Sequence, residues 1–232
     1  MMKLKSEVKK IVKTKLLDLL GAKFNISFAR SGDDLQLMKL INNSSPGVYI
    51  DIGSWHPKKA SNTYFFYLRN WKGICIDPNP ELKGLYDTMR PNDIFINAGV
   101  GNSNSRMNYH MFSESSMNTF SNSFIEKNNL GDKIIKTIEV PIYSLKEILD
   151  KHIKSSDRLD FFDIDVEGFD LEVLKTNDWD LYRPKVVVIE TDLSIKEDIN
   201  SEIVEYLESK RYRLIGKSII KENLGNLFLI SN

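Results

Sequence analysis

Acidic side chains stand at the ends of several short apolar runs of the sequence. Asp51 ends "VYID" and is followed by Gly53, Asp77 ends "ICID", and Glu190 ends "VVVIE". A carboxylate at such a position is poorly suited to a core and well suited to binding hydroxyls or a cation. Because ligands of parallel α/β sheets bind beyond the carboxyl ends of the strands, we expect these acids to face one site.

The turn after the first apolar run reads "DIGSWHP". It lacks the further glycines of G-x-G-x-x-G, which disfavours a dinucleotide, whereas one glycine after an acid allows close approach of an amino-acid-bearing nucleoside. Asp77, at the end of the next strand, is placed to accept the hydroxyls of a ribose. His56 in this turn either acts as a general base near neutral pH or stabilises the turn before Pro57.

A third group of acids lies in "RLDFFDIDVEG" as Asp163, Asp165 and Glu167. Neighbouring carboxylates raise one another's pKa, which suits a proton acceptor. The same oxygens, with Glu190, could hold a divalent cation. An alternative interpretation is the D-x-D pair of a metal-dependent glycosyltransferase, formed by Asp163 and Asp165. A non-enzymatic binding module is a third interpretation, if residues 55–57 block the ligand.

The elements that must position these residues are strands separated by helical segments. Near-continuous apolar strands that alternate with helices indicate an α/β fold with a mostly parallel sheet covered on both faces. The strands are expected near residues 48–51, 74–77, 94–98, 159–164 and 185–190, and residues 211–230 are expected to form a final antiparallel strand pair. The Ser- and Asn-rich stretch 102–129 is expected to be a functional loop or lid.

Composition limits the classes of protein. Thirty-two basic residues balance 32 acidic ones among the 232, which gives no general attraction to nucleic acid. The single cysteine, Cys75, lies in an apolar run and excludes an internal disulfide. No apolar stretch reaches the roughly 20 residues of a membrane span, and a signal peptide is not recognisable. We therefore expect a soluble, cytoplasmic protein.

The first part of the chain has its own pattern. Apolar residues at spacings of three and four predict an amphipathic helix over residues 3–20, whose other face is rich in lysine, including Lys9, Lys10 and Lys13. This face is either solvated or contacts an anionic partner. We expect residues 1–30 to form a helix on or beside the main domain and residues 31–232 to form one domain. Association into a homo-oligomer is left open.

Six segments together resemble the FkbM family of S-adenosylmethionine-dependent methyltransferases. They are "YIDIGSWHP", "SNTYFFYLRNWKGICIDPNP", "INAGVG", "MNTFS", "RLDFFDIDVEGFDLEVLKTNDW" and "KVVVIE", and they span roughly residues 46–190. The resemblance implies a Rossmann-like seven-stranded methyltransferase fold and O-methylation of a sugar or sugar-derived precursor, such as a nucleotide sugar or lipid-linked sugar. Two departures stand out: Trp55, His56 and Pro57 occupy positions where a small residue, Asn and Gly are more usual, and Asp163 replaces a frequent Lys.

The resemblance also implies roles for individual residues. The cofactor would contact Asp51, Gly53, Ser54, Asp77, Asn97, Ala98 and Gly99. Asp165 and Glu167 match the acids of the family that face the reaction site, and Ser116, Asn118 and Thr119 lie in a polar segment that matches its substrate side. Apart from the resemblance, His56 is a further catalytic candidate from its place in the turn, and Asn62 and Thr63 are further substrate candidates from their place before the aromatic run. A divalent cation, if one binds, would take its ligands from Asp163, Asp165 and Glu190.

Overall fold

The computed structural model describes Lys15 and residues 25–41, 45–102 and 105–232. The predicted helix over residues 3–20 therefore lies, apart from Lys15, outside the described residues, and the division of the chain at residue 30 stays a prediction. Within the described ranges, no helix has both the length and the apolarity that are needed to cross a membrane.

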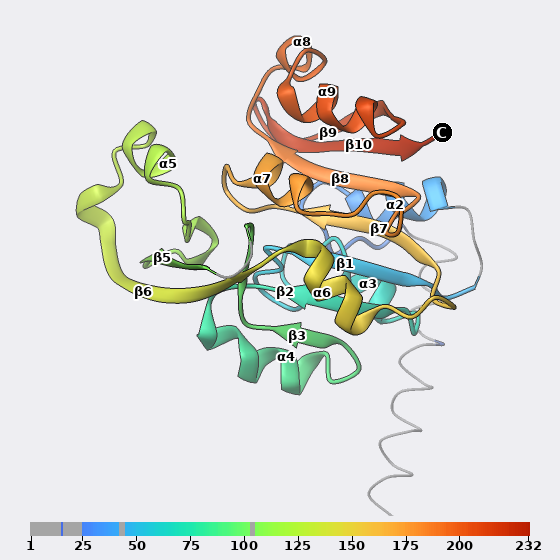
Figure 1. The fold of residues 1–232 in the computed structure, drawn as a ribbon, viewed down its shortest axis with the longest axis horizontal. Coiled ribbons are helices and arrows are strands. Elements are labelled where there is room, and N and C mark those ends of the chain that lie inside the picture. Colours follow the sequence, from blue (N-terminus) through green and yellow to red (C-terminus); the bar gives the residue numbers. More distant parts are fainter. Residues whose placement is uncertain (1–14, 16–24, 42–44, 103–104) are drawn as a thin grey trace, which may run out of the picture.

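A seven-stranded sheet forms the centre of the molecule, with the strand order β3-β2-β1-β7-β8-β10-β9 (Figure 1). The neighbours from β3 to β8 are parallel, whereas β10 runs antiparallel to both β8 and β9. The strands are β1 (Val48–Ile52), β2 (Lys72–Ile76), β3 (Ile94–Ile96), β7 (Leu159–Ile164), β8 (Val186–Thr191), β9 (Tyr212–Lys221) and β10 (Leu224–Ser231). The predicted fold class, with its antiparallel C-terminal pair, is confirmed.

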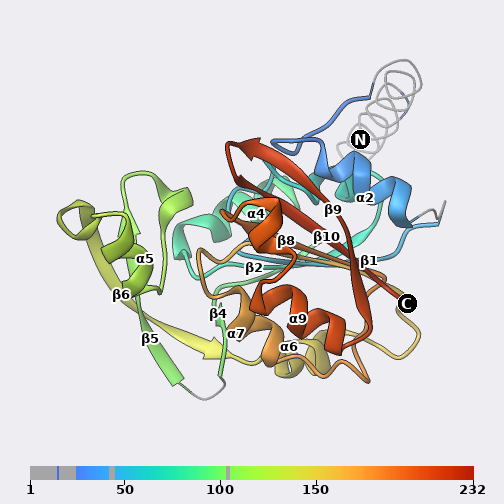
Figure 2. The ribbon, with the colours of Figure 1, turned by 90° about the horizontal axis from the view of Figure 1, so that it is seen from above.

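Helices cover both faces of this sheet (Figures 1 and 2). Successive side chains of a strand point to opposite faces, so Ile50 packs with one layer of helices and Tyr49 with the other. The layer against Ile50 is formed by α6 (Leu145–His152), α7 (Asp170–Lys175) and α9 (Glu202–Ser209). The layer against Tyr49 is formed by α2 (Asp33–Ile41), α3 (Tyr64–Tyr67) and α4 (Lys83–Met89), and the short α8 (Ile195–Asp198) precedes α9.

A second sheet with the order β4-β6-β5 lies beside the first. It consists of β4 (Gly99–Val100), β5 (Ser105–Phe112) and β6 (Ile134–Tyr143), and α5 (Asn122–Lys127) connects β5 to β6. The prediction of a loop over residues 102–129 was therefore wrong for β5 and α5. In β5 the polar side chains stand on a more exposed face while Tyr109 and Met111 are buried, and Ser121 caps α5.

Candidate active site

The carboxyl ends of the central strands open into one cavity of about 280 Å³. Its floor is formed by the ends of β1, β2, β7 and β8, and its opposite wall by residues 115–120 beside the second sheet. Further lining comes from the segment that leads into and begins α2 and from the β9–β10 hairpin, through Arg30, Asp33, Ile220, Leu224 and Asn226. These last residues lie far from the acids in the sequence, and no local pattern marks them.

The turn after β1 is locked against the neighbouring strands. Gly53 has φ +81°, and a Cβ at this position would lie 1.7 Å from the carbonyl oxygen of Asp165. The N–H groups of Gly53 and Ser54 donate to the carbonyl of Ile76 at 2.9 and 3.2 Å. Because only glycine tolerates both the left-handed conformation and the close contact, this turn requires it.

Asp77 holds the same turn from the end of β2. Its carboxylate accepts hydrogen bonds from the N–H groups of Trp55 at 2.9 Å and Asn79 at 2.8 Å. Burial raises the pKa of Asp77 to about 7, although both hydrogen bonds oppose the shift. Each carboxylate oxygen has a second lone pair, so Asp77 can still accept hydrogen bonds from ligand hydroxyls in the cavity.

Ser54 Oγ and Asn118 Nδ2 are buried beside the cavity, and these two side chains interact with the hydroxyls of Tyr86 and Tyr109, respectively. Both residues line the cavity and can also contact the polar groups of a ligand. Ala98 and Gly99 also line the cavity. Asn97 does not; it is exposed, and its side-chain amide donates to the carbonyl of Asp77.

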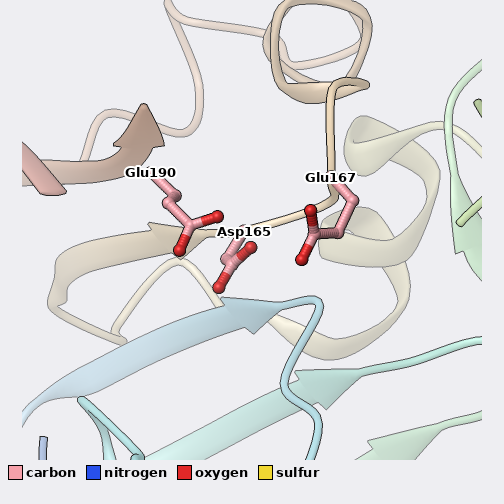
Figure 3. A group of neighbouring side chains, drawn as sticks. All are labelled: Asp165, Glu167 and Glu190. Atoms are coloured by element: carbon pink, nitrogen blue, oxygen red, sulfur yellow. The ribbon is translucent and has the colours of Figure 1, made fainter. Parts of the chain in front are cut away.

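Three carboxyl groups meet at the ends of β7 and β8 (Figure 3). One oxygen from each of Asp165, Glu167 and Glu190 lies within 4.8 Å of the others. Burial, with the charge of Asp165, raises the pKa of Glu167 to about 8 and that of Glu190 to about 10. Burial also raises the pKa of Asp165, against hydrogen bonding by Glu190. The raised pKa values of Glu167 and Glu190 favour the protonated form of both glutamates at neutral pH.

Asp51 and Asp163 lie deeper and are already engaged. Asp51 accepts a hydrogen bond from the hydroxyl of Thr63, and Asp163 accepts one from the amide of Asn62 at 3.1 Å. Burial raises the pKa of Asp51 to about 6 and that of Asp163 well above its usual range. The cluster open to a cation is thus Asp165 with Glu167 and Glu190, and the expectation that Asp163 belongs to it is not met by the geometry.

Besides Asn97, two further predicted site residues, His56 and Thr63, do not line the cavity. The Nδ1 of His56 accepts hydrogen bonds from the N–H groups of Lys58 and Lys59, both at 3.0 Å, and partial burial with the charge of Lys59 lowers its pKa. This arrangement corresponds to the turn-stabilising role. Thr63 is fully buried behind Asp51, so its contact is with the floor of the cavity and not with a substrate.

The wall made by residues 115–120 is tied to the floor at two points. The indole N–H of Trp55 donates to Ser115 Oγ at 2.9 Å, and the hydroxyl of Thr119 donates to the carbonyl of Glu167 at 3.3 Å. The predicted substrate residues Asn62, Ser116, Asn118 and Thr119 all line the cavity. Trp55, at a position where the sequence departs from the family pattern, thus joins the turn after β1 to this wall of the cavity.

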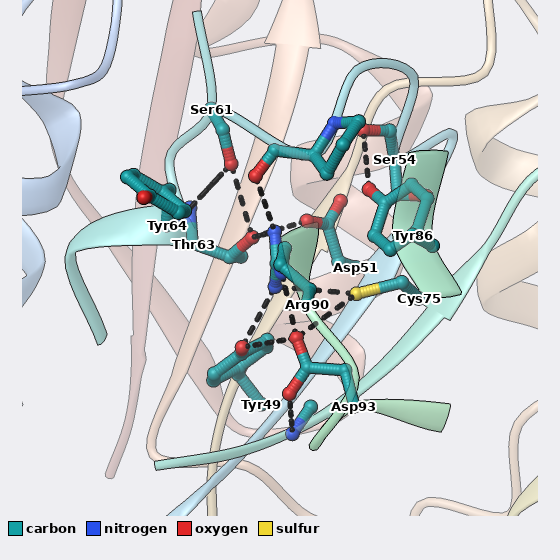
Figure 4. Close-up of polar contacts among 12 residues, drawn as sticks. Tyr49, Asp51, Ser54, Ser61, Thr63, Tyr64, Cys75, Tyr86, Arg90 and Asp93 are labelled. Carbon is teal, nitrogen blue, oxygen red and sulfur yellow. Dashed lines mark hydrogen bonds and ion pairs between the residues drawn. The ribbon is translucent and has the colours of Figure 1, made fainter. Parts of the chain in front are cut away.

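A buried arginine that the sequence did not single out supports the turn from behind (Figure 4). Arg90 is 1% exposed and forms an ion pair with Asp93 at 2.6 Å. One of its terminal nitrogens donates to Thr63 Oγ1 at 3.0 Å and to the carbonyl of Pro57 at 3.3 Å. Since Thr63 in turn donates to Asp51, Arg90 fixes both the floor acid and the far end of the turn.

The fold and the site define the class: a Rossmann-like methyltransferase, with a glycine turn after β1, an acid after β2 and acids after β7. A model of the family described as "Methyltransferase FkbM domain" matches residues 47–214. The chain belongs to the FkbM methyltransferase family, as the sequence predicted, and its methyl donor is S-adenosylmethionine. No curated protein matches the chain. The glycosyltransferase interpretation has no support in these findings.

Solved structures of methyltransferases resemble the chain at low identity. The precorrin-6y C5,15-methyltransferase of Geobacter metallireducens is 14% identical with a TM-score of 0.47, and the match covers 85% of this chain and 86% of that one. The 1,6-didemethyltoxoflavin-N1-methyltransferase of Burkholderia thailandensis, solved with S-adenosylhomocysteine, is 10% identical with a TM-score of 0.46, and the match covers 99% of this chain and 90% of that one. The O-methyltransferase of Bacillus cereus is 11% identical with a TM-score of 0.40, and the match covers 97% of this chain and 91% of that one.

Proposed function

We propose that the protein transfers a methyl group from S-adenosylmethionine to a hydroxyl oxygen of a sugar or sugar-derived precursor. The observation that carries the proposal is the position of Asp165, which stands beside the Gly53 turn and lines the same cavity as the polar side chains of residues 115–120. A sugar hydroxyl needs a group that takes or directs its proton, and a carboxylate among neutral acids is suited to that task.

The cofactor would lie across the floor of the cavity with its adenine near Gly99, its ribose at Asp77 and its methionine part at Gly53. Asp77 would accept the ribose hydroxyls, Gly53 and Ser54 would border the methionine part, and Ala98 and Gly99 would border the adenine. S-Adenosylmethionine supplies a sulfonium-bound methyl group that an oxygen nucleophile can attack in line. The acids at the end of β7 suit the positive charge of that sulfonium, because opposite charges attract strongly where water is scarce.

The protein would contribute alignment, exclusion of water and proton handling. Trp55 and the wall of residues 115–120 shield the region above the β1 turn. Asp165 would accept or orient the proton of the acceptor hydroxyl, and Glu167 and Glu190 would share negative charge by hydrogen bonding. Orientation of two reactants in a pocket is worth several kcal/mol of the barrier, so this arrangement can act without a covalent intermediate.

A divalent cation is a second way to use the same acids. Asp165, Glu167 and Glu190 offer three hard oxygen ligands in one place. A bound cation would displace the protons of the glutamates and lower the pKa of an acceptor hydroxyl. Turnover that is lost on chelation and restored by magnesium would select this role over direct proton transfer.

The acceptor is proposed from the chemistry of the wall. Asn62, Ser116, Asn118 and Asn226 offer amides and hydroxyls, which match a polyhydroxylated ligand better than a flat aromatic one. A sugar precursor in nucleotide-activated or lipid-linked form would be met in the cytoplasm. The lysine-rich face expected over residues 3–20 would favour the phosphates of such a precursor, an attraction that weakens with salt.

The test is methyl transfer to a panel of acceptors. The full-length protein is incubated with S-adenosylmethionine and nucleotide sugars, sugar phosphates, free sugars, catechols and peptides, and products are identified by mass spectrometry. We expect transfer to an activated sugar ahead of the free sugar. Efficient methylation of catechols or peptides, with none of the sugars modified, would contradict the proposed acceptor and leave the methyltransferase assignment in place.

A further inference from the structure

The charge of the cavity lining is strongly one-sided. Among the described residues that line it, Arg30 carries the one cationic side chain. Seven acids line the same cavity: Asp33, Asp51, Asp77, Asp163, Asp165, Glu167 and Glu190. Arg30 is exposed and forms no hydrogen bond or ion pair with another described residue, so its guanidinium is available to a ligand.

Arg30 stands on a segment that is firmly attached to the domain. The carboxylate of Asp34 accepts hydrogen bonds from the hydroxyl of Ser27 at 2.6 Å and the N–H of Phe28 at 2.7 Å. The carbonyl of Phe28 accepts a hydrogen bond from the N–H of Ser61 at 3.1 Å, and its ring packs edge-on against Tyr64. The backbone that leads to Arg30 is therefore fixed before a ligand arrives.

The contacts of this segment also locate Arg30 above the sheet. On one side the segment contacts Ser61, which follows β1, and on the other Ser31 contacts Ser218 of β9 at 3.2 Å. The strands between β1 and β9 are β7, β8 and β10. Arg30 thus lies over the ends of β7 and β8, where its charge opposes the rise in the pKa of Asp165 and Glu167.

The methionine part of the cofactor needs a partner with this charge. It carries an ammonium and a sulfonium, which suit the acids, and a carboxylate, which the acids repel. An arginine binds a carboxylate through paired, charge-assisted hydrogen bonds. We propose that Arg30 binds the methionine carboxylate of S-adenosylmethionine and so fixes the end of the cofactor that lies beyond the β1 turn. The inference concerns the cofactor and does not depend on the identity of the acceptor.

The direction of the cofactor across the strand ends agrees with this assignment. A ribose at Asp77 on β2 and a methionine at Gly53 on β1 continue toward β7, the side on which Arg30 stands. An acceptor phosphate is the other anion that Arg30 could meet. We favour the methionine carboxylate for two reasons. It belongs to a ligand that the family requires, and Arg30 is the one cationic side chain among the described residues that line the cavity.

The test compares two ligands on two proteins by titration calorimetry. The ligands are S-adenosylhomocysteine and S-adenosyl-3-thiopropylamine, which has the same structure without the carboxylate. We expect Arg30→Gln to weaken S-adenosylhomocysteine binding about 10- to 100-fold and to change binding of the amine less than about 2-fold. Arg30→Lys should recover part of the loss. Arg106→Gln removes an exposed arginine of β5 outside the cavity and serves as the matched control.

Two outcomes would overturn the proposal. If Arg30→Gln weakened the binding of both ligands equally, Arg30 would act through the acidic side chains of the cavity and not on the methionine carboxylate. Unchanged binding of both, with a raised KM for the acceptor, would assign Arg30 to the acceptor. Since the titrations contain no acceptor, an error in the proposed sugar substrate would leave their result unaffected.

Discussion

Gly53 lies directly against the backbone carbonyl of Asp165, with no room for a side chain between them. The N–H of Asp165 donates to the carbonyl of Ile52 at 2.9 Å, so the turn after β1 and the end of β7 form one unit. Gly53, proposed to border the cofactor, and Asp165, proposed to handle the acceptor proton, are thereby held at a fixed separation. Loss of this contact should disturb both functions together.

Gly53→Ala should abolish S-adenosylhomocysteine binding or prevent folding, because a Cβ would lie 1.7 Å from the Asp165 oxygen at φ +81°. Gly84→Ala is the matched control: the site lies in α4 and has open space, so alanine should raise the free energy of unfolding by about 0.5–1 kcal/mol. Urea unfolding and calorimetry measure the two effects. Normal binding by Gly53→Ala would contradict the role of this turn.

Asp77→Ala should weaken S-adenosylhomocysteine binding by about 1–3 kcal/mol through loss of charge-assisted hydrogen bonds to the ribose. It also removes the two hydrogen bonds that hold Trp55 and Asn79. Asp87→Ala, which breaks only the exposed ion pair with Lys83, is the control and should bind normally. Unchanged affinity in a folded Asp77→Ala protein would remove Asp77 from the cofactor site.

Asp165→Asn should lower turnover about 100-fold or more while cofactor affinity stays within a few-fold, because the amide keeps the shape and loses the proton acceptor. Glu167→Gln should cost less, since Glu167 already carries a proton at neutral pH. Steady-state rates with the identified acceptor, beside calorimetry, separate the two effects. Near-normal turnover of Asp165→Asn would show that another group accepts the proton of the acceptor hydroxyl.

The acids at β7 and β8 also predict how stability depends on pH. Glu167 and Glu190 have pKa values of about 8 and 10 in the folded protein, against an ordinary 4.5, so the folded chain retains protons that the unfolded chain releases. The free energy of unfolding should therefore fall as pH rises from about 5 to 9, by at most about 1.4 kcal/mol per pH unit for each retained proton. Solvent in the cavity will reduce this slope.

Glu190→Gln tests that slope, because glutamine supplies a neutral side chain at every pH. Urea unfolding at pH 6 and pH 9 should show a smaller difference for Glu190→Gln than for the unmodified protein, with greater stability at pH 9. Glu208→Gln, an exposed change in α9, should leave the slope as it was. An identical slope in all three proteins would show that Glu190 is not neutral in the folded state.

The sequence predicted the central sheet well because its strands are local apolar runs that end in acids. Asp51, Asp77 and Glu190 were placed at strand ends from their immediate neighbours alone, and the strand order brings them to one cavity. The Ser- and Asn-rich stretch 102–129 was misread, since polar residues on the exposed face of β5 and at the cap of α5 have the same composition as a loop.

The parts of the site that escaped prediction depend on contacts between distant residues. Arg90 ends α4 in a sequence that favours exposure, and only the folded chain brings Asp93 and Thr63 around it. Arg30 reaches the cavity because its segment packs against residues after β1 and in β9. For the same reason the sequence left open whether His56 is a general base or stabilises the turn. Its hydrogen bonds with the N–H groups of Lys58 and Lys59 agree with the turn-stabilising role.

The second sheet has a consequence for how the family can diversify. The strand ends that form the floor of the cavity are dispersed along the chain, whereas the wall at residues 115–120 comes from a single stretch between β5 and α5. Insertions, deletions and exchanges within that stretch would reshape the proposed acceptor side of the cavity without changing the parallel strands. In this chain, changes to a short, contiguous piece of the gene would therefore alter this wall, provided that the hydrogen bonds of Ser115 with Trp55 and of Thr119 with Glu167 are kept.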